Sequence, residues 1–226
     1  MQIAIDGPAG AGKSTIAKLV AKRYKITYLD TGAMYRAITW LIDHLQIDFK
    51  ATEEIIEQTK NAEITFQDDR VFLNGQDVSK EIRMPKISEH TSDIAKIKEV
   101  REILVDRQRK IAVQDSVIMD GRDIASVVLP DADYKFYLDA SVEERGRRRY
   151  EELLEKGDPS KSYEVVCQDI QQRDYYDRHR KESPLICTKD AMIIDTTGLN
   201  ISEVCEAIYS KIDEDKNDRS LLKRQN

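Results

Sequence analysis

The residues best suited to chemistry stand near the start of the chain, in the segment IAIDGPAGAGKST (residues 3–15). Its glycines leave the backbone bare, so that successive N–H groups can approach one anion that side chains would otherwise block. The spacing Gly7-x-x-x-x-Gly12-Lys13-Ser14 fits in full the P-loop pattern, in which the lysine reaches the β- and γ-phosphates and the serine hydroxyl binds Mg²⁺. A plain Gly-rich turn between a strand and a helix is the alternative.

The flanking segments supply the elements that such a loop requires. QIAI before the loop is typical of a strand, and KSTIAKLVAKRY after it carries Ile16, Leu19, Val20 and Tyr24 at helical spacing. This context favours phosphate binding over a plain turn, because the helix adds the positive end of its dipole. We therefore predict a nucleoside triphosphate site formed by Gly7, Pro8, Ala9, Gly10, Ala11, Gly12, Lys13, Ser14 and Thr15, with Ser14 as the metal ligand.

Clustered arginines form a second set of candidates. They lie in REILVDRQRK (101–110), GRD (121–123), ERGRRRY (144–150) and QRDYYDRHR (172–180), although the net charge is −6. In an acidic chain, such clusters are either solvated helix faces paired with Asp and Glu or a convergent anion site. For ERGRRRY both interpretations stay open, because nearby glutamates could pair with its arginines at i,i+4.

One predicted helix places Arg173, Asp177 and Arg180 at i, i+4 and i+7, on a shared face. Taken alone, this trio favours a surface ion pair. We interpret Tyr175 and Tyr176 beside it as packing residues. Elsewhere, a predicted strand ends in an aspartate at position 120 and another at position 6, and either carboxylate could orient water on Mg²⁺ or be purely structural.

The order of elements predicts an α/β fold. Five short core strands, expected at residues 2–5, 26–30, 116–123, 134–141 and 191–197, alternate with helices. This order is typical of a three-layer P-loop fold with a five-stranded parallel core sheet, formed by residues 1–31 and 111–226. The last helix is expected from Ser202 to about Ile212, followed by a charged tail that frays.

A change of period predicts an insertion into this core. AEITFQDDRVFLNGQDVS (62–79) alternates apolar and polar residues and contains Asn74-Gly75, which indicates a small antiparallel hairpin or meander. Because antiparallel strands fit poorly into a parallel core, we expect residues 32–110 to form an inserted lobe. A shorter segment at about 150–165, between two predicted helices, is expected to act as a lid over the triphosphate, with Arg145, Arg148 or Arg149 closing on it.

Composition narrows the class of protein. The 226 residues are 40% apolar and 35% charged, without a signal-peptide pattern or an apolar run long enough for a membrane span, so we expect a cytoplasmic protein with no membrane partner. The three cysteines are far apart, which favours reduced thiols. Scattered histidines are expected to be solvent or packing residues. The acidic net charge and the absence of a basic stripe count against nucleic-acid binding.

Four motifs read in order resemble the bacterial cytidylate kinase family: GPAGAGKST, YLDTGAMYRA, GRDIASVVLPDADYKFYLDASVEERGRRR and QRDYYDRHRKESPL. The first is shared by many nucleotide-binding proteins, whereas LDTGAMYR, GRD and RD-x-x-D-R-x-R together are close to diagnostic. The resemblance extends to about residue 210. It implies a P-loop nucleoside monophosphate kinase, expected to be a monomer, that transfers the γ-phosphoryl group of ATP to CMP or dCMP with Mg²⁺.

The resemblance also implies roles for individual residues. Phosphate-gripping arginines match Arg36, Arg122 and Arg180, the base-reading set matches Ser92, Arg101 and Asp123, the sugar-contacting pair matches Arg173 and Asp177, and Thr31 keeps the hydroxyl where the family often has serine. With Lys13, the three phosphate-gripping arginines are the expected catalytic residues. Physical chemistry agrees, because guanidinium groups grip phosphate oxygens bidentately and phosphoryl transfer depends on aligning and neutralising anions.

Base recognition imposes a geometric condition. Cytosine offers an amino donor beside acceptors, so a carboxylate next to an arginine or a hydroxyl is its natural complement. Ser92 and Arg101 are nine residues apart, which at about 100° per residue places them on opposite sides of a straight helix. A break between them is therefore expected if both contact one base.

Three other functions compete with this one. A kinase for uridylate or a polyol acid would share the fold and differ in base selectivity. A nucleotide-switch protein would read guanine through an Asn-Lys-x-Asp segment, and TKDA (188–191) has the wrong spacing. A nucleic-acid-processing P-loop protein is disfavoured by the charge.

Overall fold

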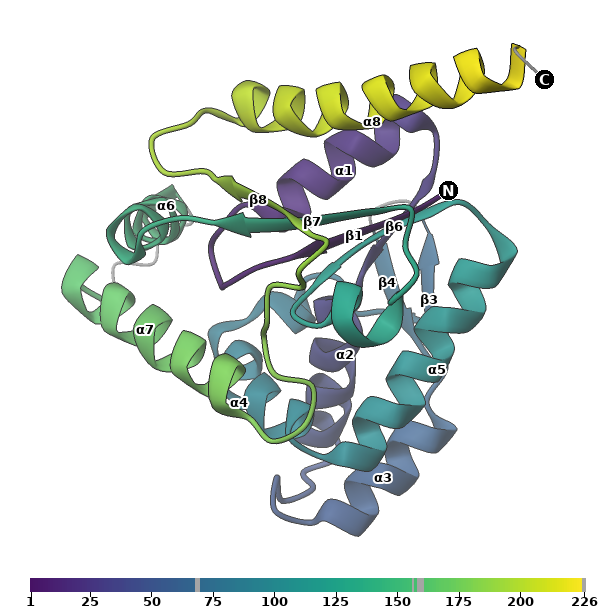
Figure 1. Ribbon diagram of the computed structural model, residues 1–226. Coiled ribbons are helices and arrows are strands. Elements are labelled where there is room, and N and C mark those ends of the chain that lie inside the picture. Colours follow the sequence, from purple (N-terminus) through teal and green to yellow (C-terminus); the bar gives the residue numbers. More distant parts are fainter. Residues whose placement is uncertain (68–69, 156, 158–160, 225–226) are drawn as a thin grey trace. The chain divides into compact units, whose positions relative to one another are not determined.

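A computed structural model of the chain describes residues 1–67, 70–155, 157 and 161–224 (Figure 1). It divides into two compact units, one formed by Met1–Tyr28 with Ser116–Asn226 and the other by Leu29–Asp115. The lobe expected at residues 32–110 falls inside the second unit. Among the described helices, none is long and apolar enough to cross a membrane.

The first unit is built on a parallel sheet, as the alternation of strands and helices predicts. The strands of the sheet are β1 (Gln2–Asp6), β2 (Thr27–Asp30), β6 (Val117–Gly121), β7 (Tyr134–Asp139) and β8 (Met192–Asp195), in the order β2-β6-β1-β7-β8. The boundary between the two units falls within β2, after Tyr28. β1 lies at the centre, pairing in parallel with β6 through Ile5 and Asp120 and with β7 through Ile5 and Phe136. The carboxyl ends of β1 and β6 therefore meet at one edge, where Asp6 pairs with Gly121.

Helices pack against this sheet, and several of them begin just after the carboxyl end of a strand. They are α1 (Lys13–Tyr24), α6 (Val142–Glu155), α7 (Tyr163–His179), α8 (Ile201–Arg224) and a π-helical turn at Ile124–Val128. α1 and α8 lie against each other on one face of the sheet (Figure 1). Val20 of α1 and Ile208 of α8 are fully buried there with Ile3, Ile5 and Leu138 from the strands. This apolar cluster packs β1 and α1 together and so holds both ends of the phosphate loop in place.

The C-terminal helix is longer than the sequence pattern suggests. We expected it to end near Ile212 and the tail to fray, but α8 runs from Ile201 to Arg224. The expectation was wrong because the spacing of apolar residues in the sequence weakens after Ile212, whereas helix propensity continues. The segment DEDKNDRSLLKR contains neither glycine nor proline, so nothing in it breaks the helix.

The second unit combines helices with a small antiparallel sheet. Its helices are α2 (Thr31–His44), α3 (Thr52–Asn61), α4 (Pro85–Ala95) and α5 (Lys98–Gln114), with a 3₁₀ turn at Glu81–Arg83, and its strands are β3 (Ile64–Gln67), β4 (Arg70–Leu73) and β5 (Gln76–Asp77). The strands form the meander β3-β4-β5 that the alternation of residues predicts. Asn74 and Gly75 between β4 and β5 both have positive φ, as a tight hairpin turn requires.

The break expected between Ser92 and Arg101 is present. α4 ends at Ala95 and α5 begins at Lys98, and the carbonyl of Ile97 accepts a hydrogen bond from the backbone N–H of Arg101 at 3.1 Å. The two residues therefore lie on separate helices, so the objection that a straight helix would hold them apart no longer applies.

Candidate active site

The P-loop joins β1 to α1 through a run of glycines in conformations that other residues rarely adopt. Gly7, Gly10 and Gly12 have φ of 147°, 79° and 85°. A Cβ on Gly7 would also overlap the backbone carbonyl of Leu138, so this position needs glycine on two grounds. Gly12 is the left-handed residue before α1, and its carbonyl accepts the N–H of Ile16 at 3.1 Å.

Lys13 lies at the first position of α1 and is buried at 6% exposure. Its ammonium donates to the carbonyl of Pro8 at 2.7 Å, so the lysine folds back across the loop. The pKa of Lys13 is lowered to about 7, first by burial and then by the positive charges of Arg122 and Arg173, against the opposing effect of Asp120 and Asp6. A cationic group held this way favours a strongly anionic ligand.

Ser14 contacts the end of strand β6. Its hydroxyl donates to Asp120 Oδ2 at 2.8 Å, and Tyr28 donates to the other oxygen of the same carboxylate at 2.9 Å. A hydroxyl beside a carboxylate is an all-oxygen donor pair, which suits a hard divalent cation. Sequence reasoning identified Ser14 and left Asp120 open, but it missed Tyr28, which fixes the orientation of Asp120.

Asp6 has a structural position. Its two oxygens accept the backbone N–H groups of Ile124 and Ala125 at 2.9 and 2.7 Å, so it holds the π-helical turn after β6. Burial raises the pKa of Asp6 to about 6, partly offset by these two hydrogen bonds. Because both oxygens are engaged in this way, the structural alternative fits Asp6 better than a role beside the metal.

Arg122 and Asp177 form the centre of a charged cluster. Arg122 follows directly after β6, and Asp177 lies on α7. Arg122 Nε donates to Asp177 Oδ2 at 2.8 Å, and Arg180 approaches the other oxygen of Asp177 at 3.9 Å. Burial opposes ionisation of Asp177, but Arg122, Arg173 and Arg180 outweigh it and keep its pKa below the ordinary value. Asp123 is 3.8 Å from Arg180. The cluster is thus a set of arginines held in place by buried carboxylates.

The structure rules out one alternative and corrects two expectations. Asp177 is only 8% exposed, so the trio on α7 is not a surface ion pair. Arg180 follows the helix, which ends at His179, and does not lie on its last turn. Tyr175 and Tyr176 are 60% and 44% exposed, so they do not pack in the core, although the ring of Tyr175 contacts those of Tyr176 and His179.

Arg36 and Thr31 lie in the first turns of α2. The side chain of Asp30 caps this helix through the N–H of Ala33 at 2.8 Å, and the same carboxylate accepts from Arg36 at 2.8 Å. A Cβ on Gly32 would meet Arg36 at 3.0 Å, so the glycine leaves space for the guanidinium. Thr31 is buried at the start of the helix. The motif LDTGAMYR is thus a capped helix start that orients one arginine.

Arg101 and Ser92 belong to the same unit as Arg36. Arg101 is 4% exposed, and its guanidinium lies 5.3 Å from the ring centroid of Tyr35 and donates to the carbonyl of Ala95 at 3.2 Å. The last contact ties α5 to the end of α4, the helix that carries Ser92. Their joint role in reading a base stays a prediction.

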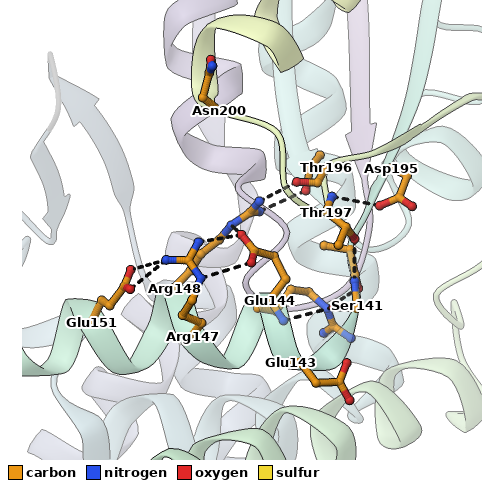
Figure 2. Close-up of polar contacts among 12 residues, drawn as sticks. Ser141, Glu143, Glu144, Arg147, Arg148, Glu151, Asp195, Thr196, Thr197 and Asn200 are labelled. Atoms are coloured by element: carbon orange, nitrogen blue, oxygen red, sulfur yellow. Dashed lines mark hydrogen bonds and ion pairs between the residues drawn. The ribbon is translucent and has the colours of Figure 1, made fainter.

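The arginines of ERGRRRY divide into two groups. Arg147 pairs with Glu144 and Glu151, and Arg148 pairs with Glu144 and donates to the carbonyl of Thr196 at 2.6 Å (Figure 2). The exposed pair of Arg147 with Glu151 supports the interpretation of a solvated helix face, whereas Arg148 is half-buried and bonded to Thr196. Arg145 differs, because it is buried and bonded to the P-loop, a contact that sequence reasoning did not foresee.

The remaining candidates are structural. His44, His90 and His179 stack on Trp40, Phe49 and Tyr175. The three cysteines are free, as predicted. Within the described part of the chain, no group of three or more His, Cys, Asp or Glu is placed to hold a metal ion. The expected lid at about 150–165 lies partly outside the described residues and stays a prediction.

The parallel sheet, the glycine loop and the buried Lys13 define a P-loop nucleotide-binding protein. The family model for cytidylate kinase matches residues 3–214. The cytidylate kinase of Caldanaerobacter subterraneus subsp. tengcongensis is 55% identical over 212 residues, which cover 94% of each chain. That of Clostridioides difficile (strain 630) is 52% identical over 210 residues, covering 93% of this chain and 97% of the relative. The chain belongs to the cytidylate kinase family.

The fold is also shared with distant structures. An uncharacterized protein from Eubacterium ventriosum ATCC 27560 superposes with a TM-score of 0.53 at 14% identity, covering 94% of this chain and 98% of that one. At this identity the likeness shows the fold alone.

Proposed function

We propose that this protein transfers the γ-phosphoryl group of ATP to CMP or dCMP, giving ADP and the corresponding diphosphate. The observation that carries the proposal is the buried Lys13, folded across a glycine loop and accompanied in the same unit by Arg122, Arg173 and Arg180. Several fixed cations beside a phosphate-binding loop are what a reaction between two anionic nucleotides needs, because alignment and charge neutralisation supply most of the catalysis.

The donor half of the proposal uses the P-loop. Its bare backbone N–H groups, with Lys13 and the start of α1, suit a triphosphate. Ser14 and Asp120 supply oxygen donors, so they would hold Mg²⁺ directly or through water. When bound, the ion would neutralise charge on the phosphates. The fit is good because the hydroxyl and carboxylate are already within hydrogen-bond distance of each other.

The acceptor half uses the arginines and carboxylates that the family motifs single out. Arg36, Arg122 and Arg180 would grip the phosphate of CMP, so that one of its oxygens attacks the γ-phosphorus while the bond to the β-phosphate oxygen breaks. Arg173 and Asp177 would contact the sugar. Each of these roles is inferred from the motifs, and the contacts of Arg36 with Asp30 and of Arg122 with Asp177 are consistent with it.

Base selectivity would rest on Asp123, Arg101 and Ser92. A carboxylate can accept the amino proton of cytosine, whereas uracil presents a carbonyl there and would be repelled. Asp123 is buried at 5% exposure, so an unpaired acceptor beside it would be costly. We therefore propose that cytosine is preferred over uracil at this position.

A coupled assay of ADP release tests the function directly. Purified protein with ATP and Mg²⁺ is given CMP, dCMP, UMP, AMP or GMP in turn, and CMP and dCMP should have the highest kcat/KM. Omission of Mg²⁺ should abolish turnover. Equal or better turnover of AMP or GMP would refute the proposal, and a preference for UMP would support the uridylate alternative. We also propose that the protein acts as a monomer in the cytoplasm, and that its partners are small molecules and not nucleic acids.

A further inference from the structure

We propose that Arg145 and Asp174 are positioning residues that clamp the P-loop at Ala9 and thereby tie the triphosphate site to helix α7. Both residues lie in the first unit, Arg145 on α6 and Asp174 on α7. The proposal rests on the proposed use of ATP as phosphoryl donor. It gives Asp174 a role, and it gives Arg145 a role different from the lid contact expected from the sequence.

The clamp engages both polar groups of one loop residue. Arg145 donates to the carbonyl of Ala9 at 2.9 Å, and the N–H of Ala9 lies 3.3 Å from Asp174 Oδ1. The two side chains also pair with each other, with Arg145 2.6 Å from Asp174 Oδ2. A further bond from Arg145 to the carbonyl of Ala140, at 2.9 Å, anchors the guanidinium to the residue after β7.

Two glycines allow this approach. A Cβ on Gly146 would overlap the sulfur of Cys167, so the glycine lets α6 and α7 pack closely enough for Arg145 and Asp174 to meet. A Cβ on Gly10 would lie 3.2 Å from Arg145, tighter than ordinary van der Waals contact. Gly146 follows Arg145 in the sequence, and Gly10 lies against the side chain of Arg145.

Because the pair is buried, it adds little to the free energy of folding, and its main effect is to hold Ala9 in one position. Arg145 and Asp174 are 3% and 7% exposed. Desolvation of two charges offsets much of their attraction, so apolar replacement of such a pair is often neutral for folding, whereas removal of one partner is not. Fixed hydrogen bonds to Ala9 remain as the specific contribution of the pair, because apolar side chains cannot make them.

The clamp connects directly to groups that the reaction would use. The neighbour of Ala9 is Pro8, whose carbonyl accepts from Lys13 at 2.7 Å, so a shift of Ala9 would move Lys13. On α7, Asp174 is preceded by Arg173 and followed one turn later by Asp177. The clamp thus holds the lysine of the donor site at a fixed distance from the charged residues of α7.

A double variant separates positioning from folding. Arg145→Met with Asp174→Leu removes both charges and keeps similar volume, so it should fold with a near-normal unfolding transition. We expect its Kd for ATP, measured by calorimetry without acceptor, and its KM for ATP to rise roughly 10–100-fold, because a loop displaced by about 1 Å loses its alignment. The Kd for CMP, measured without ATP, should change little.

Controls make the outcome decisive. Lys211→Gln with Asp215→Asn removes an exposed ion pair from α8, and all constants should stay within about twofold of the unmodified protein. If the apolar double variant does not fold, Arg145→Lys, which cannot form the guanidinium fork, takes its place and should show a smaller rise in the ATP constants. Unchanged ATP constants in a folded variant would overturn the clamp. Absence of CMP phosphorylation by the unmodified protein would instead refute the proposed function.

Discussion

At the scale of single residues, Lys13 combines burial with a contact to the loop that it would serve. Its ammonium donates to Pro8, and burial with the neighbouring arginines brings its pKa to about 7. At pH 8 the free protein therefore holds this lysine mostly neutral. An adjacent triphosphate would favour the charged form and raise its pKa.

Binding of ATP at pH 8 should then be accompanied by uptake of most of one proton. Calorimetry in two buffers of different ionisation enthalpy measures this uptake. At pH 6 it should be small, because Lys13 is already protonated. Lys13→Arg carries a fixed charge and serves as the control for protons exchanged by ATP itself. Equal uptake by both proteins at pH 8 would show that Lys13 does not titrate on binding.

Asp123 gives the sharpest test of base selectivity. Asp123→Ala should raise KM for CMP and narrow the preference for CMP over UMP by roughly 1–3 kcal/mol, the value of a good contact to a base edge. The affinity for ATP should change little. The structure offers a second role, because Asp123 faces Arg180 at 3.8 Å and could simply orient it.

The two roles of Asp123 predict different kinetics. If it only orients Arg180, kcat/KM for CMP and UMP should fall together with an unchanged ratio, because both nucleotides carry the same phosphate. Measurement of kcat/KM for both nucleotides on one purified variant decides between them. An unchanged ratio would remove Asp123 from the base-reading set.

Local motifs identified the residues whose chemistry is visible in the sequence. The P-loop spacing and the LDTGAMYR motif predict Lys13, Ser14 and Arg36, because the role of each follows from its neighbours in the chain. The contacts of Arg145 and Asp174 with Ala9 could not be found this way. Each of the two residues is one charge among many on a polar helix, and only the packing of Gly146 against Cys167 brings them to Ala9. The partner of Arg122 was missed for the same reason.

At the scale of elements, the glycines of the P-loop differ in what they allow. Gly7 has positive φ, and a Cβ there would overlap the carbonyl of Leu138 in β7. Gly12 also has positive φ, but a Cβ would meet nothing within 4 Å. Alanine at Gly12 should therefore cost only the backbone strain, roughly 1–2 kcal/mol, whereas alanine at Gly7 adds displacement of the central sheet.

Urea unfolding of the two alanine variants measures this difference. Gly7→Ala should lower the free energy of unfolding by more than Gly12→Ala, with the Gly12→Ala loss close to the strain of one left-handed residue, about 1–2 kcal/mol. Gly75→Ala, at a hairpin turn with φ of 81° and no contact within 4 Å, provides a matched control outside the P-loop. Equal losses at Gly7 and Gly12 would mean that the contact with β7 relaxes freely.

Element boundaries were predictable where the chain carries a start or stop signal. The Asn74-Gly75 signal marks the turn between β4 and β5. The break between α4 and α5 was instead expected from the joint role proposed for Ser92 and Arg101. The end of α8 was not predictable from burial, because the helix continues to Arg224 without a breaker. The periodicity of apolar residues marks the part of a helix that packs on the core, and the helix can continue beyond that part when no residue breaks it.

At the scale of the whole molecule, α6 and α7 form a pair with a small apolar cluster of their own. Leu153, Val166 and Ile170 are buried together, separate from the cluster around the sheet. The contacts of Arg145 and Asp174 with Ala9 connect this pair to the P-loop. Such an arrangement favours α6 and α7 acting as one body attached to the P-loop, so that a closing movement would be confined to the segment between the two helices.

The lid hypothesis then predicts which amides respond to ligand. ATP analogue and CMP together should slow hydrogen exchange in residues 150–165 more than either ligand alone, because closure would exclude water from the reacting phosphates. Residues 201–212 of α8, buried against α1 in the main core, serve as an internal control and should show no such additional protection.

Exchange is followed by mass spectrometry of peptides from both segments in four conditions, without ligand, with each ligand and with both. If residues 150–165 exchange at the same rate with both ligands as without them, the segment does not close over the nucleotides and the lid hypothesis is wrong. If they respond fully to the ATP analogue alone, closure depends on the donor only, and the acceptor has no part in it.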